Sequence, residues 1–131
     1  MKNVSLFSMT LVRIFTGYLI LRYGLELFHI QLLLEFLQKT NVLFPNFTGY
    51  AAKTIELVGG FCLIIGLFTR WVTPLLIAVM CGVIYTTTNE SIFDGEFPFL
   101  FLLLFVVFFI NGAGKWSVDN LLKTRRDAKN K

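Results

Sequence analysis

The chain has 131 residues, of which 56% are hydrophobic and 15% charged, with a formal net charge of +4. Globular proteins average about 25% charged residues, so this composition leaves too little polar surface for a soluble fold and predicts an integral membrane protein. The positive charge does not indicate a nucleic-acid partner, because the basic residues cluster where the topology of a membrane protein needs them.

Four apolar segments follow one another along the chain, at about residues 6–28, 50–68, 71–87 and 97–113. A hydrocarbon core about 30 Å thick requires about 20 residues of helix, and each segment is close to that length. The sequence therefore predicts an all-α membrane protein with a four-transmembrane-helix bundle over residues 1–122. A basic cytoplasmic tail is expected at residues 123–131.

The first segment contains three ionisable side chains, Arg13, Arg22 and Glu26. A charge in the bilayer is unfavourable unless it is paired, hydrated or able to reach the surface. Arg22 and Glu26 share one helix face, whereas Arg13 lies about 180° away from Arg22. We expect Arg22 and Glu26 to line the interior or an outer vestibule. The mostly apolar residues 30–37 predict that the first helix continues as an interfacial segment.

Glu56 is the acidic residue of the second segment, at a depth similar to that expected for Arg22. The sequence therefore predicts an ion pair between Arg22 and Glu56. Two interpretations of this pair stay open: it locks two helices together, or Glu56 handles protons beside an arginine that holds an anionic or quinone oxygen. A single histidine and two separate cysteines, Cys62 and Cys81, predict no metal site.

Small residues indicate where helices approach each other closely in lipid. Thr73 and Pro74 suit the start of the third helix, because proline is tolerated in a first turn. The fourth segment has no small residue from Phe99 to Ile110, so it is expected to pack through its phenylalanines or to face lipid. The glycines expected at helix contacts are Gly17, Gly24, Gly59, Gly60, Gly66 and Gly82.

Basic residues are distributed unevenly between the two sides that four alternating helices would create. Lys39 and Lys53 would lie toward one side, and eight basic residues toward the other. This asymmetry predicts that both termini are cytoplasmic, in a bacterial inner membrane. The eight are Lys2, Arg70, Lys115, Lys123, Arg125, Arg126, Lys129 and Lys131.

Three stretches of the chain resemble the DoxX family. Leu11 to Arg13 with Gly17 looks like the first helix of that family, Glu56 to Arg70 like its second helix and cytoplasmic turn, and residues 111–119 like its closing segment. The family's first helix often ends in Gly-x-x-Lys, whereas here Leu25, Glu26 and Leu27 follow Gly24. The residues expected to form a cytoplasmic boundary motif are Arg70, Gly112, Gly114, Trp116, Ser117 and Asp119.

The resemblance implies a four-helix membrane protein, in a group that includes a small subunit of a thiosulfate:quinone oxidoreductase and membrane partners of redox enzymes. We therefore predict a small quinone-associated or redox-partner membrane subunit, with no covalently bound cofactor and with quinone as candidate ligand. Its polar intramembrane site would comprise Arg13, Arg22, Glu26 and Glu56, with Glu56 the candidate for proton handling. It would either hold a lipid-soluble quinone or anchor a redox enzyme or second membrane subunit through its tail. The alternative is a non-enzymatic small-solute transporter or membrane-integrity factor.

Overall fold

The computed structural model of the chain describes residues 2–87 and 96–131. Every regular element in these residues is helical, as the composition predicts. The elements in chain order are α1 (Lys2–Gly24), the 3-10 helix η1 (Leu25–His29), α2 (Gln31–Lys39), α3 (Pro45–Ile65), α4 (Thr69–Thr87), α5 (Glu96–Asn111) and α6 (Val118–Lys129).

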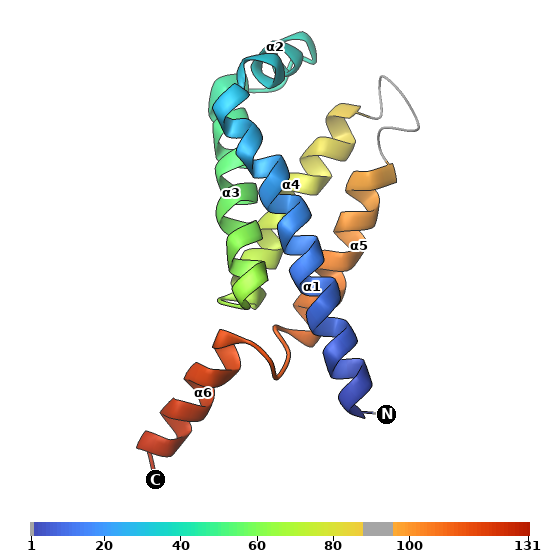
Figure 1. Cartoon of the computed structure of the whole chain (residues 1–131). Coiled ribbons are helices and arrows are strands. Elements are labelled where there is room, and N and C mark those ends of the chain that lie inside the picture. The colour runs from blue at the N-terminus through green and yellow to red at the C-terminus, as the bar shows by residue number, and fades with distance from the viewer. Residues whose placement is uncertain (1, 88–95) are drawn as a thin grey trace.

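The long helices form one bundle, in which α1 packs on α3 and α4 packs on α5. The short helix α2 lies at one end of the bundle, and α6 extends from the opposite end, where both ends of the chain are found (Figure 1). Three helical stretches are long and apolar enough to cross a membrane: Ser5–His29, Pro45–Ile65 and Thr69–Thr86. The apolar helix Glu96–Asn111 is shorter, about 24 Å in length. The architecture is that of a helical membrane protein.

The helix ends differ by a few residues from those expected, for local reasons. Helix α3 begins at Pro45, because proline suits the first turn of a helix. It ends at Ile65 and is capped by Gly66, whose φ of 72° is the left-handed conformation that commonly closes a helix. Helix α4 begins at Thr69, so Pro74 lies inside it and does not mark its start. The start is earlier because a side chain distant in sequence binds the first amide groups of α4, as described below.

Two segments outside the long helices are themselves helical. Residues 31–39 form α2, in agreement with the expected continuation after the first helix. Most of the expected basic tail belongs to α6, whose first turn is capped by the Ser117 hydroxyl oxygen, which accepts a hydrogen bond from the Asn120 amide at 3.3 Å. Sequence reasoning missed this helix because its charges indicated only a solvated tail.

Large apolar side chains fill the centre of the bundle. Helix α5 contributes Phe101, Phe105 and Phe108, which lie on one face because they are spaced four and three residues apart. The Phe101 and Phe105 rings stack with centroids 6.2 Å apart, and Tyr23 of α1 meets Phe101 edge to face at 6.1 Å. Helix α5 therefore packs through its phenylalanines. The other buried hydrophobic members of this cluster are Ile20, Leu63, Leu76 and Met80.

Glycines bring α1 and α3 into backbone contact. A Cβ at Gly60 would lie 2.6 Å from the backbone nitrogen of Leu21, and a Cβ at Gly17 would lie 2.9 Å from the carbonyl oxygen of Gly60. A Cβ at Gly24 would overlap the backbone of Leu57. A Cβ at Gly59 would lie 3.0 Å from Cδ2 of Leu76 in α4. Gly82 differs from the expectation, because nothing described lies within 4 Å of the position of its Cβ.

Candidate functional site

Two carboxylates meet at Lys53 of α3, in the half of the bundle near α2. Its Nζ lies 3.0 Å from Oε2 of Glu26 in η1 and 3.0 Å from Oε2 of Glu56, one turn further along α3. It also donates a hydrogen bond to the carbonyl oxygen of Tyr23 at 3.2 Å. Carbonyl groups in the last turn of a helix lack intrahelical partners, so Lys53 satisfies the end of α1 while it holds two carboxylates.

This cluster extends from the molecular surface into the bundle. The Glu26 side chain is 60% exposed, whereas those of Lys53 and Glu56 are 9% and 5% exposed. A buried charge is tolerated when it is paired and hydrogen-bonded, and removing one partner leaves the other uncompensated. Lys53 and Glu56 therefore depend on each other.

The expected pair of Arg22 and Glu56 is wrong: Lys53 is the partner of Glu56. Arg22 is exposed, and the described residues contain no ion pair that involves it. The reason is the rotation of α1 about its axis. Gly17 and Gly24 face α3, and Arg22 lies about 140° or more around the helix from both.

Lys53 was overlooked as a functional residue because its position near the start of the second segment suggested an interfacial charge. One signal in the sequence does point to it. Lys53 and Glu56 are three residues apart with opposite charge, so they share a helix face and can pair.

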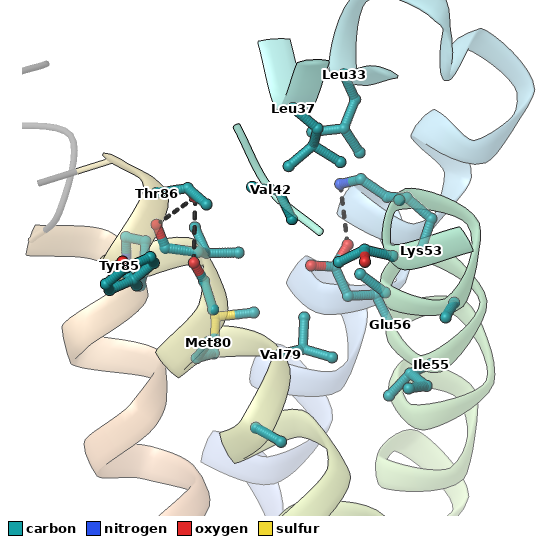
Figure 2. Close-up of a pocket in the computed structure, with 18 of the residues that line it drawn as sticks. Leu33, Leu37, Val42, Lys53, Ile55, Glu56, Val79, Met80, Tyr85 and Thr86 are labelled. Atoms are coloured by element: carbon teal, nitrogen blue, oxygen red, sulfur yellow. Dashed lines mark hydrogen bonds and ion pairs between the residues drawn. The ribbon is translucent and has the colours of Figure 1, made fainter. Parts of the chain in front are cut away.

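A pocket of about 990 Å³ lies beside this cluster. Parts of α2, α3 and α4, the residues between α2 and α3, the start of α5 and Tyr23 of α1 line it, and most of the lining is apolar. Lys53 and Glu56 are the charged side chains among the described residues that line it. Figure 2 shows them on the α3 side of the pocket, across from Val79 and Met80 of α4. Several lining residues are well exposed on the flank of the bundle, among them Leu43, Phe47, Tyr85 and Phe97.

The carboxylate of Glu56 has one oxygen that Lys53 does not use. Lys53 binds Oε2, and no described residue donates to Oε1. Among the described residues, two polar side-chain atoms are fully buried without a partner, Arg13 Nε and Thr69 Oγ1. Glu56 Oε1 is not one of them, so this oxygen keeps some accessible surface. In Figure 2 the carboxylate lies between Lys53 and the open space toward α4. Glu56 therefore presents a free oxygen to the pocket.

Arg13 belongs to a second polar region, at the opposite end of the bundle. It is 2% exposed and donates to the carbonyl oxygens of Ala113 and Trp116, the latter at 3.0 Å. These bonds hold the linker between α5 and α6 against α1. The four residues expected to form one intramembrane site are thus separated: Glu26 and Glu56 meet at Lys53, Arg22 is exposed, and Arg13 lies elsewhere.

Asp119 organises the same end of the bundle. Its carboxylate accepts hydrogen bonds from the amides of Phe68 at 2.8 Å and Thr69 at 3.1 Å. The Asp119 amide in turn donates to the carbonyl oxygen of Gly66 at 3.1 Å. A carboxylate on the first amides of a helix is favourable because these groups lack intrahelical partners and carry a partial positive charge.

The other residues of the expected boundary motif lie at the start of α4 and in the linker between α5 and α6. Gly66 has a positive φ, and a Cβ there would lie 2.6 Å from Cβ of Ser117. Gly112 approaches the Arg70 side chain, with its Cβ position 3.3 Å from Nε. The Trp116 ring is exposed while its carbonyl binds Arg13. Gly114 has a φ of 78° and nothing described within 4 Å of its Cβ position.

Comparison with known proteins gives two matches. The family model of DoxX matches residues 8–89. A protein of Bacillus subtilis (strain 168) named "Putative oxidoreductase CatD" is 30% identical over 112 residues, which cover 83% of this chain and 82% of that protein. No solved structure matches the chain.

Proposed function

Since this chain belongs to the DoxX family of membrane proteins, we propose that it is a small redox subunit that holds a lipid-soluble quinone. The observation that carries the proposal is the free oxygen of Glu56 in the wall of an apolar pocket. A relative that is named as an oxidoreductase supports the redox assignment.

The pocket has the properties that such a ligand requires. Small-molecule sites have volumes of about 300–1,000 Å³ and are mostly apolar, with a few polar groups that orient the ligand. The volume here, about 990 Å³, would admit a quinone ring and part of an isoprenoid chain. The exposed apolar flank at Phe47 and Phe97 would let the chain extend into lipid.

The chemistry assigned to Glu56 is proton transfer. When a hydroquinone is oxidised, its two O–H bonds break and it releases two protons and two electrons. The Glu56 carboxylate would accept one of these protons, forming a carboxylic acid, while Lys53 holds the other carboxylate oxygen in place. The second proton would pass to water at the membrane surface. The electrons would pass to a redox enzyme or a second membrane subunit that carries the electron acceptor.

The proposed orientation places both termini in the cytoplasm of a bacterial cell, with α5 as a fourth span of the inner membrane. The two ends of the chain lie at the same end of the bundle (Figure 1), and Trp71 and Trp116 are exposed, as aromatic residues at a membrane interface are. A helix of 16 residues is shorter than an average bilayer core of about 30 Å, but local thinning of the bilayer accommodates short spans.

Extraction tests the proposal. The chain is purified in mild detergent, and its organic extract is analysed for quinones against a membrane protein of similar size from the same cells. We expect quinone and hydroquinone together in a stoichiometric amount with the wild-type chain, and a smaller amount with a folded Val79→Phe variant, whose larger side chain would fill part of the pocket. Equal traces of quinone in the extracts of the wild-type chain, the variant and the reference protein would favour the non-enzymatic alternative. In that alternative the charges of Lys53 and Glu56 only hold helices together.

A further inference from the structure

We infer that the pocket selects its ligand by a hydrogen-bond donor, so that a hydroquinone binds in preference to the corresponding quinone. This inference rests on the proposed function, because it concerns the redox state of the ligand in the same pocket. It follows from the donors and acceptors that the pocket wall offers.

Lys53 has no donor left for a ligand. A lysine ammonium carries three N–H donors and no acceptor. Three acceptors surround Nζ: Oε2 of Glu56 at 3.0 Å, Oε2 of Glu26 at 3.0 Å and the carbonyl oxygen of Tyr23 at 3.2 Å. The cation that an acceptor ligand would be expected to seek is therefore saturated by the protein itself.

Glu56 offers the opposite chemistry. In the ion pair with Lys53 it is a carboxylate, which only accepts hydrogen bonds. Lys53 occupies Oε2, and Oε1 remains accessible with no donor among residues 2–87 and 96–131. A ligand that satisfies Oε1 has to supply the hydrogen.

The threonines around the pocket do not supply donors either. The hydroxyl groups of Thr40, Thr48 and Thr86 each donate to backbone carbonyl groups of neighbouring residues. Their oxygens retain lone pairs and can only accept from a ligand. The lining residues with other side-chain donors are Tyr23, Asn41 and Tyr85, and all three are exposed. The Tyr23 ring packs edge to face on Phe101, so none of the three is an enclosed donor beside Glu56.

This arrangement distinguishes the two redox states of one ligand. The oxygens of a quinone are acceptors, and beside Oε1 they would place lone pairs against lone pairs. A hydroquinone of the same shape carries two O–H donors, one of which can bind the Glu56 carboxylate. Hydrogen bonds to a charged group are among the stronger ones in proteins, so we expect a preference of about tenfold or more for the hydroquinone.

Binding of three matched ligands tests the inference. A short-chain hydroquinone, its quinone and its dimethyl ether are titrated calorimetrically into the detergent-solubilised full chain in one anaerobic buffer. We expect the hydroquinone to bind at least tenfold tighter than both others. The ether keeps the apolar shape but lacks the donor, so equal binding of ether and hydroquinone would overturn the inference without any variant.

The variant Glu56→Gln makes the prediction sharper. Lys53 would keep the amide oxygen, and the amide NH₂ group would then face the pocket as a donor. The order of affinities should reverse, with the quinone bound tighter than the hydroquinone. The matched control is Glu35→Gln, an exposed position on α2 that does not line the pocket, and it should keep the wild-type order.

The outcomes separate the inference from the proposed function. Binding of none of the three ligands would overturn the proposed function and this inference with it. Binding of hydroquinone and quinone with equal affinity would leave the proposed function standing and overturn the selection by a donor. A folded Glu56→Gln variant that still prefers the hydroquinone would also overturn it.

Discussion

Gly17 of α1 and Gly60 of α3 face each other where the two helices cross. A Cβ at Gly17 would lie 2.9 Å from the carbonyl oxygen of Gly60, and a Cβ at Gly60 would lie 2.8 Å from the carbonyl oxygen of Gly17. Both neighbours are backbone atoms, which cannot move aside as a flexible side chain can. The contact therefore fixes the distance between α1 and α3, and with it the approach of Glu26 to Lys53.

Replacing Gly60 with alanine should destabilise the bundle. The added methyl group would push α1 away from α3, and overpacking of this kind costs about 1–3 kcal/mol. Thermal unfolding in detergent should show a lower midpoint for Gly60→Ala and Gly17→Ala. Gly82→Ala is the matched control, because its Cβ would meet no described atom within 4 Å and alanine favours helix by about 0.5–1 kcal/mol. Equal midpoints for Gly60→Ala and Gly82→Ala would refute the close contact.

Lys53 and Glu56 should be coupled energetically. Lys53→Met leaves the Glu56 carboxylate buried without its partner, a change that costs about 3–5 kcal/mol in buried pairs. The double variant Lys53→Met with Glu56→Leu removes both charges and should be more stable than Lys53→Met alone. The free energy of unfolding of all four proteins gives the coupling.

Lys39→Met serves as the control for this cycle, because Lys39 is an exposed lysine of α2 and its loss should have little effect. Arg22→Leu distinguishes the observed pair from the one expected from sequence. Its effect on the free energy of unfolding should add to that of Glu56→Leu when the two are combined. Additive losses for Lys53 and Glu56 themselves would show that this pair contributes no coupling.

Asp119 should stabilise the start of α4. Asp119→Ala removes the acceptors of the Phe68 and Thr69 amides, and loss of such a cap costs about 0.5–2 kcal/mol. Hydrogen exchange followed by mass spectrometry should show faster exchange in the first turn of α4. Asp127→Ala, at an exposed acidic position of α6, should leave that exchange unchanged, and identical protection in both variants would show that the cap is dispensable.

The proposed orientation predicts where a reporter fused after Lys131 is active. An even number of spans and the basic residues of α6 place this end in the cytoplasm, so a cytoplasmic reporter should be active and a periplasmic one inactive. A fusion between α2 and α3, after Lys39, should give the opposite pattern. Strong periplasmic activity at Lys131 would invert the orientation and place the Lys53 cluster on the cytoplasmic side.

The helices of this protein were predictable because helix formation in lipid depends on local properties. In lipid, a helix satisfies the hydrogen bonds of its own backbone, so segment length and apolar content are enough to predict one. These two properties located α1, α3, α4 and α5 to within a few residues. The inward phenylalanines of α5 and the shared face of Lys53 and Glu56 also follow from spacing within a single helix.

Only the tertiary structure decided which helix faces meet. The glycine contact between α1 and α3 turns Arg22 outward. Arg22 and Glu26 would share a face of one continuous α-helix, but Glu26 lies in the 3-10 helix η1 and reaches Lys53 from there. Asp119 binds amides 51 and 50 residues earlier in the chain, and residues of five helices line the pocket. Such contacts depend on the rotation and crossing of whole helices, which packing determines and the spacing of residues along one helix does not.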